Sequence, residues 1–144
     1  MATTYDAIYE RAIFRFMDYD FLKLSNDQRA SMLERHLRSA IVDFQSSCQT
    51  DLTQRDETLK TFKEALTDEE QEILSLGVAY YWVSFKALNS DLLRNNMSTR
   101  DYSYFSPANL LGEVRALRDT LKKEYEDRII AYSYLHGGIE KWKV

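Results

Sequence analysis

The chain is short of the residues that interrupt or cross-link a fold. Its 144 residues include one proline, Pro107, four glycines and one cysteine, Cys48. So few prolines and glycines favour long regular elements over many tight turns. A single cysteine excludes an internal disulfide and a paired-cysteine metal site, which is consistent with a reducing compartment.

Long apolar runs and strongly basic stretches are also missing. No apolar run approaches the roughly 18 residues of a membrane-spanning helix, and no basic-then-apolar leader is present. We therefore expect neither membrane insertion nor secretion. The net charge is −4, whereas a nucleic-acid binder needs a basic surface to neutralise phosphates. Tight DNA binding is not expected.

The motifs of enzymes and metal sites are absent as well. There is no HExxH, ExxH or CxxC, and no glycine-rich loop that would hold a phosphate. Within the predicted helices, neither His36 nor His136 has a His or Glu partner at metal-ligand spacing. We expect His36 at the surface or boundary of its helix, and His136 at a helix C-terminus, where a positive charge complements the dipole. No enzyme activity, metal or cofactor is expected.

What the sequence has instead is helical periodicity. Four helices are predicted, at about 5–17, 27–45, 68–95 and 107–135, so the fold class is all-α, a single-domain helical bundle over 1–138. The first two buried faces are expected to consist of Tyr5, Ile8, Tyr9, Ala12, Ile13, Phe16, and of Ala30, Leu33, Leu37, Ile41 and Phe44. Ser25, Asn26 or Asp27 would cap the second helix.

The third helix is predicted to be the central one. Thr67 and Glu70 form a capping box at its start, and apolar residues cover most of its circumference, which is typical of a helix buried on several sides. Trp82 is expected in the core. Gly77 has no side chain, so a neighbouring helix can approach closely there.

Residues 45–66 are polar and poorly periodic, and we expect an ordered loop with a short hairpin or one helical turn. Leu52, Leu59 and Phe62 are its few apolar anchors. Residues 51–72 carry eight acids and three bases. Two interpretations stay open for this acidic stretch: a solvated edge, which we favour, or a docking surface for a basic partner.

The last predicted helix has the longest uninterrupted helical pattern in the chain. Ser106 is a good N-cap and Pro107 fits the first helical position. About 29 residues at 1.5 Å each give a helix of roughly 43 Å. Its apolar stripe would consist of Leu110, Val114, Leu117, Leu121, Tyr125, Ile129 and Tyr132. Gly137–Gly138 then separate it from a short tail, 139–144, too short to bury Ile139, Trp142 and Val144 alone.

Four segments occur in an order that carries a family resemblance: DLTQRDETL at 51–59, LTDEEQEIL at 66–74, STRDYSYFSPANLLGEVRALRD at 98–119 and IIAYSYLHGG at 129–138. Together they resemble the head–tail connector (neck adaptor) proteins of tailed bacteriophages that infect Gram-positive bacteria. The resemblance covers about 28–138. That family has no catalytic motif to transfer.

The resemblance implies a structural virion protein in the neck, at the head–tail interface, assembled in the host cytoplasm. It implies a dodecameric ring with an axial channel, in which DNA is only transient cargo. The implied partners are the portal protein, neighbouring copies in the ring and a downstream stopper or tail-completion protein, with no membrane. The alternative is a non-viral helical protein–protein interaction or regulatory module.

Candidate interface residues lie at the end of the long helix and in the tail. They are Tyr132, Tyr134, Leu135, Ile139, Lys141, Trp142, Lys143 and Val144. The hypothesis is that the tail docks on the portal with Trp142 as an aromatic anchor. The alternative is that Trp142 packs back on its own subunit.

Overall fold

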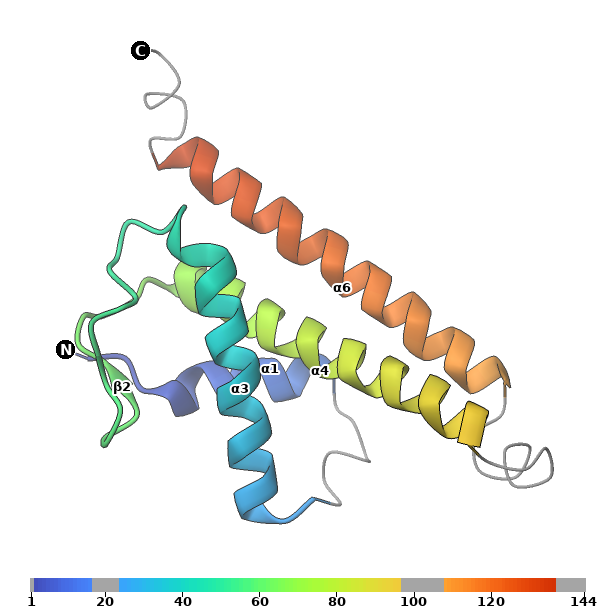
Figure 1. Ribbon diagram of the computed structural model, residues 1–144. Coiled ribbons are helices and arrows are strands. Elements are labelled where there is room, and N and C mark those ends of the chain that lie inside the picture. The colour runs from blue at the N-terminus through green and yellow to red at the C-terminus, as the bar shows by residue number, and fades with distance from the viewer. Residues whose placement is uncertain (1, 17–23, 97–107, 137–144) are drawn as a thin grey trace.

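The computed structural model describes residues 2–16, 24–96 and 108–136, with side chains described outside 89–96 and 108–111. Within these residues the chain forms four helices and one small antiparallel sheet (Figure 1). The helices are α1 (Tyr5–Phe16), α3 (Asn26–Gln45), α4 (Asp68–Asn96) and α6 (Ala108–Leu135). Each boundary lies within one residue of its predicted position, and the predicted all-α class with a long C-terminal helix is confirmed. Ser106 and Pro107 lie outside the described residues.

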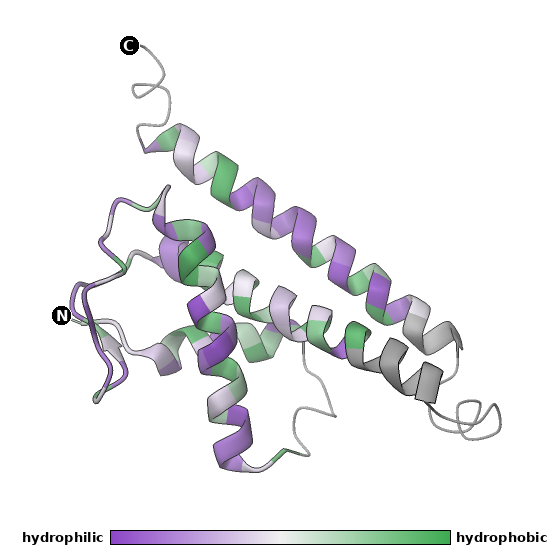
Figure 2. Cartoon of the chain, viewed as in Figure 1, coloured by the Kyte–Doolittle hydropathy of each residue, from purple (hydrophilic) through white to green (hydrophobic). Residues whose placement is uncertain are grey.

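Helix α4 is the centre of the molecule, as predicted. It packs against α1, α3 and α6, and α6 runs alongside it in the opposite direction while α3 crosses it (Figure 1). Trp82 is buried, with 5% of its surface exposed. The visible face of α6 is mostly hydrophilic (Figure 2), so α6 buries only a narrow stripe.

Three helices meet closely at Gly77. A Cβ built on this glycine would lie 2.6 Å from Ala40 Cβ on α3 and 2.9 Å from the Tyr125 hydroxyl on α6. Both distances are too short for real contacts, so a side chain does not fit without movement. The predicted role of Gly77, close approach of a neighbouring helix, is confirmed.

A carboxylate ties the same three helices together. Asp43 on α3 accepts hydrogen bonds from the hydroxyls of Tyr81 on α4 and Tyr125 on α6, the latter at 3.1 Å. Burial and the Asp43 charge together raise the pKa of both tyrosines. Both hydroxyls therefore stay protonated and act as donors across the whole physiological range.

Side-chain caps lie at the N-termini of the two middle helices, α3 and α4. At α3, the Gln28 N–H donates to Ser25 Oγ at 3.2 Å and the Gln28 side chain accepts from the Ser25 N–H. At α4, the Glu70 N–H donates to Thr67 Oγ1 at 3.2 Å, and Glu70 Oε1 accepts from the Thr67 N–H at 2.9 Å. Both arrangements are capping boxes, and the one predicted at Thr67 is confirmed.

The loop between α3 and α4 contains a hairpin, one of the two predicted possibilities. Strands β1 (Arg55–Asp56) and β2 (Thr61–Phe62) pair antiparallel. Asp56 Oδ1 accepts the N–H groups of Thr58 and Leu59, which stabilises the turn. The chain's N-terminus joins the hairpin, because the Phe62 N–H donates to the Thr3 carbonyl at 2.8 Å. Leu52 and Phe62 are buried as predicted, but Leu59 at the turn is 70% exposed.

Some of the acidic side chains of residues 51–72 form ion pairs within the chain. Glu57 pairs with Arg38 and Arg55, and Glu72 pairs with Arg11 on α1. Such contacts favour the solvated edge over a docking surface for a basic partner.

Three predicted positions on helices are also wrong. Ala30 is exposed, because the buried positions of α3 begin only at Leu33. His36 is buried, not at the surface, since it lies on the same face as Leu33 and Ala40. Leu117 is 39% exposed, because the contact face of α6 is narrower than the apolar stripe in its sequence.

Candidate functional site

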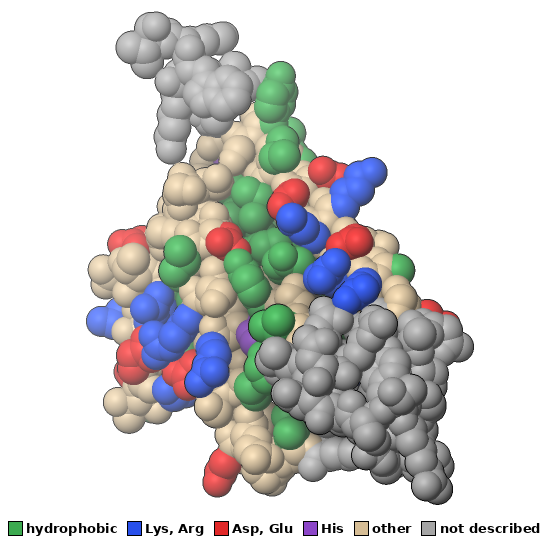
Figure 3. Space-filling view, turned by 45° about the vertical axis from the view of Figure 1, so that its right-hand side comes forward, with side chains coloured by type: hydrophobic (Ala, Val, Ile, Leu, Met, Phe, Trp, Pro, Cys, Tyr) green, Lys and Arg blue, Asp and Glu red, His purple; other side chains and the backbone are tan. Residues whose placement is uncertain are grey.

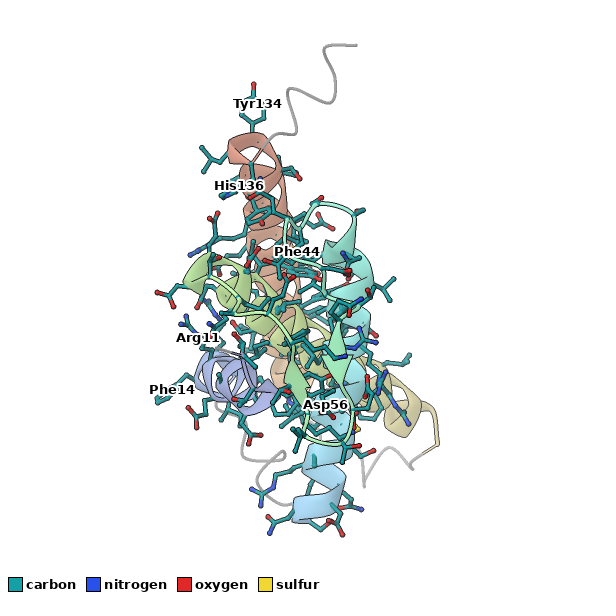
Figure 4. The ribbon with its side chains drawn as sticks, turned by 90° about the vertical axis from the view of Figure 1, so that its left-hand side faces the viewer. Arg11, Phe14, Phe44, Asp56, Tyr134 and His136 are labelled. Atoms are coloured by element: carbon teal, nitrogen blue, oxygen red, sulfur yellow. The ribbon has the colours of Figure 1, made fainter. Side chains whose placement is uncertain are left out.

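The described candidates lie in the last turns of α6, and the structure separates them. Tyr134 and Leu135 are 64% and 75% exposed, whereas Tyr132 is 1% exposed. Figure 4 shows Tyr134 pointing away from the molecule. Ile139, Lys141, Trp142, Lys143 and Val144 lie outside the described residues.

Tyr132 packs within its own chain, so its side chain is not free to meet a partner. Its hydroxyl donates to Glu70 Oε2 at 2.7 Å and accepts the Gln49 N–H at 3.0 Å. Its ring packs edge-on against Phe44, with centroids 4.9 Å apart. The periodicity of the sequence predicted that Tyr132 lies on the buried stripe of α6, and the structure confirms this burial.

Glu70 is a buried carboxylate, 2% exposed. Besides Tyr132 and the Thr67 N–H, it accepts from the Thr50 hydroxyl at 3.0 Å and from the Cys48 thiol at 3.3 Å. Burial alone would raise the pKa of this carboxyl, but the hydrogen bonds outweigh burial and lower it. Glu70 is therefore an ionised acceptor at neutral pH.

Cys48 is a structural thiol at this point. Burial, with the nearby Glu70 charge, raises its pKa to about 12. A nucleophilic cysteine needs a lowered pKa and a positive environment. The cluster therefore holds the chain together and provides no activated nucleophile.

Backbone and histidine contacts fasten the very end of α6. The His136 N–H donates to the Tyr132 carbonyl at 2.9 Å, and the Gln49 side chain donates to the His136 carbonyl at 3.1 Å. The His136 ring lies with Nε2 3.3 Å from Glu69 Oε2. We call the set Gln49, Glu69, Glu70, Tyr132 and His136 the α6 clamp. It joins three segments that are far apart in the sequence.

Beyond the clamp lies an exposed apolar surface. Ile130 and Tyr134, one helical turn apart, are 63% and 64% exposed, and Leu135 is 75% exposed. Figure 3 shows apolar side chains at this end of the molecule, above a larger apolar area over its middle. We call Ile130, Tyr134 and Leu135 the apolar end of α6. The other apolar side chains that are more than half exposed, among the residues that the structure describes, lie one on each of several separate segments: Phe14, Val42, Leu59 and Leu88.

The α6 clamp holds the exposed apolar end of α6 in a fixed position. The clamp buries Tyr132, so the side chains on the opposite face of the same turns point outward and stay in place. Grouped apolar side chains on a fixed element are typical of a protein contact surface. Among the described residues there is no group of three His, Cys, Asp or Glu side chains that would hold a metal ion. None of the helices described here is long and apolar enough to cross a membrane.

Sequence reasoning missed most of the clamp. The capping box identified Glu70 as a helix cap, but nothing in the local pattern pairs it with Tyr132, 62 residues away. Gln49 and Cys48 gave no signal at all within their polar loop. Only the placement of Tyr132 on a buried stripe pointed toward this contact.

Comparison with protein-family models, with curated proteins and with solved structures found no match for this chain.

Proposed function

We propose that this chain is a structural subunit of a phage neck, a ring-forming head–tail connector that binds the portal and leaves an axial channel for DNA. The observation that carries the proposal is the apolar end of α6, left exposed where the sequence continues into Gly137–Gly138 and the tail. The ordered resemblance of four segments to neck adaptor proteins supports the same assignment, and the helical fold is compatible with it.

In this proposal α6 is a rigid arm. The α6 clamp fixes the arm against α4 and the loop after α3, so the apolar end of α6 keeps its direction. The tail after Gly137–Gly138 then reaches the portal, with Trp142 as its aromatic anchor. Lys141 and Lys143 add positive charge to a chain of net charge −4.

The remaining partners follow from a place in the neck. Neighbouring copies complete the ring, and a stopper or tail-completion protein closes its other side. DNA would only pass through the channel, and the net negative charge of the subunit suits sliding rather than binding.

The alternative is a helical interaction or regulatory module outside any virion, since an apolar helix end fits other protein partners too. Assembly separates the two. A regulator stays a monomer or dimer when mixed with portal rings, whereas a connector adds to them as a ring.

The direct experiment mixes the protein with purified portal rings and images the product by electron microscopy. The proposal expects an added ring of density on the portal. Leu135→Ser should reduce this decoration at least about tenfold, and Leu59→Ser is the matched control, because both leucines are exposed on separate elements. Undecorated portals, or equal losses for the two variants, would contradict the proposal.

Deletion of 139–144 tests the tail separately. If the tail is the anchor, the shortened protein keeps its melting temperature but no longer decorates portals. A much lower melting temperature would show that Trp142 packs on its own subunit instead, and unchanged portal affinity would also reject the anchor.

A further inference from the structure

His36 occupies an unusual position between α3 and α4. It is 6% exposed, and its ring centroid lies 6.5 Å from that of Tyr81, 6.4 Å from Trp82 and 6.2 Å from Phe85. Its Nε2 atom is buried with no hydrogen-bond partner in the part of the chain that the structure describes. Buried polar atoms are nearly always partnered in folded proteins. The unpartnered nitrogen therefore weakens the packing between α3 and α4 around His36, which we call the α3–α4 seam.

The charges around the ring do not favour a proton. On α3 the charged neighbour is Arg35, next to His36 in sequence. On α4 the titratable residues of the stretch that carries the three rings, 80–86, are Tyr80, Tyr81, whose hydroxyl donates to Asp43, and Lys86. No described carboxylate forms an ion pair with the ring. Stacking on Tyr81 favours a cation weakly, but burial above all, together with Arg35, lowers the pKa of His36 to about 4.

An open apolar groove borders the same seam. Trp82 and Phe85, two of the three rings that touch His36, also line a groove of about 400 Å³. Its other wall is the start of α3, from Asp27 to Met32. The Asp43 contacts that tie α3 to α4 and α6 lie at the helix's far end. The half of α3 beside the groove is held instead by the buried Leu33 and by the ion pair of Glu34 with Lys60, at 2.7 Å.

We propose that His36 is an acid-sensitive switch in this seam: when it takes up a proton, the first half of α3 separates from Trp82 and Phe85 and the groove widens. The Asp43 contacts and the α6 clamp hold the rest of the molecule together. The proposal concerns the subunit itself and does not rest on its place in a virion.

The direction follows from proton linkage. The closed state holds His36 neutral, whereas the open state binds a proton near the ordinary value of 6.5. The open state therefore binds more protons between these two values, and closure weakens as pH falls through that range. Between pH 7 and pH 4.5 the open-to-closed ratio should rise by about 50-fold.

Hydrogen exchange read by mass spectrometry tests this on the full chain. The variants are His36→Gln, which cannot titrate in this range, and His136→Gln, the matched control at the chain's only other histidine. In the wild type and in His136→Gln, protection factors over 26–36 and 81–86 should fall about 50-fold at pH 4.5. They should stay constant in His36→Gln, and protection around 70–80 should persist in all three.

Several outcomes would overturn the switch. Unchanged protection in the wild type would do so, and so would equal losses in His36→Gln, since carboxylates would then be the cause. If His36→Gln does not fold, an NMR titration of the His36 ring in the wild type decides. A ring that titrates above about pH 6, near the ordinary histidine value, rejects the proposal.

Discussion

At the scale of single residues, the molecule depends on a few polar side chains that are buried with full sets of partners. Glu70 is the strongest case, because four separate groups donate to one carboxylate. Removing one partner from such a site leaves a buried charge less well satisfied, which costs more than the hydrogen bond itself. The local sequence around each residue gives no hint of this cost.

Tyr132→Phe should lower the free energy of unfolding by about 1–3 kcal/mol, since it leaves Glu70 and the Gln49 N–H without the hydroxyl. Tyr134→Phe is the control, two residues along the same helix and largely exposed; it should change stability by less than about 0.5 kcal/mol. Urea melts of both variants provide the comparison. Equal effects would mean that the clamp contributes nothing.

Trp82→Ala should cost about 3–5 kcal/mol, the range for truncating a large aromatic residue in a core. The loss would be smaller if the neighbouring rings of Phe16 and Phe85 closed the cavity. Denaturant melts measure the cost directly. A loss below about 1 kcal/mol would be incompatible with the burial of Trp82.

At the scale of elements, the close contact at Gly77 determines how α3 and α6 sit on α4. Gly77→Ala places a methyl group against Ala40 and Tyr125, so it should destabilise the protein by about 1–3 kcal/mol. This outcome opposes helix propensity, which favours alanine over glycine by about 1 kcal/mol.

Gly112→Ala is the matched control, because nothing lies within 4 Å of a Cβ built there. It should stabilise the protein by about 0.5–1 kcal/mol, since only helix propensity changes. Thermal melts of the two variants should shift in opposite directions. A stabilising effect of Gly77→Ala would mean that the three helices are less tightly packed than described.

Helices and caps could be predicted from the sequence because their causes are local. The Thr67 capping box and the apolar stripes of α1 and α3 depend only on residues within one or two turns. The misses have non-local causes. His36 was predicted at the surface, but the aromatic side chains of α4 cover it in the structure. Leu117 lies on the apolar stripe of α6, but at a position that α4 does not cover. For the candidate site, Tyr134 and Leu135 were predicted from the sequence and are exposed. The clamp that positions them could not be predicted, because it needs contacts across more than 60 residues.

At the scale of the whole molecule, α4 provides most of the contact surface for the other three helices. Because the other three helices all pack on α4, no described part of the molecule forms an independent subdomain. The protein should therefore unfold in one step at neutral pH. Far-UV circular dichroism should show more than about half helix, above the usual third.

Two probes test this cooperativity. The helical signal and the fluorescence of Trp82, read in a Trp142→Phe background, should melt at the same temperature. An earlier change at Trp82 would show that the α3–α4 seam opens separately even without acid.

The central position of α4 also has a consequence for biosynthesis. Helices α1 and α3 leave the ribosome first, yet the surface that buries their apolar faces is α4, which ends at Asn96. At about 5–20 residues per second, those faces stay uncovered for roughly 3–10 s after α3 is complete. Nascent chains of this protein should therefore recruit chaperones during that interval and release them once α4 has emerged.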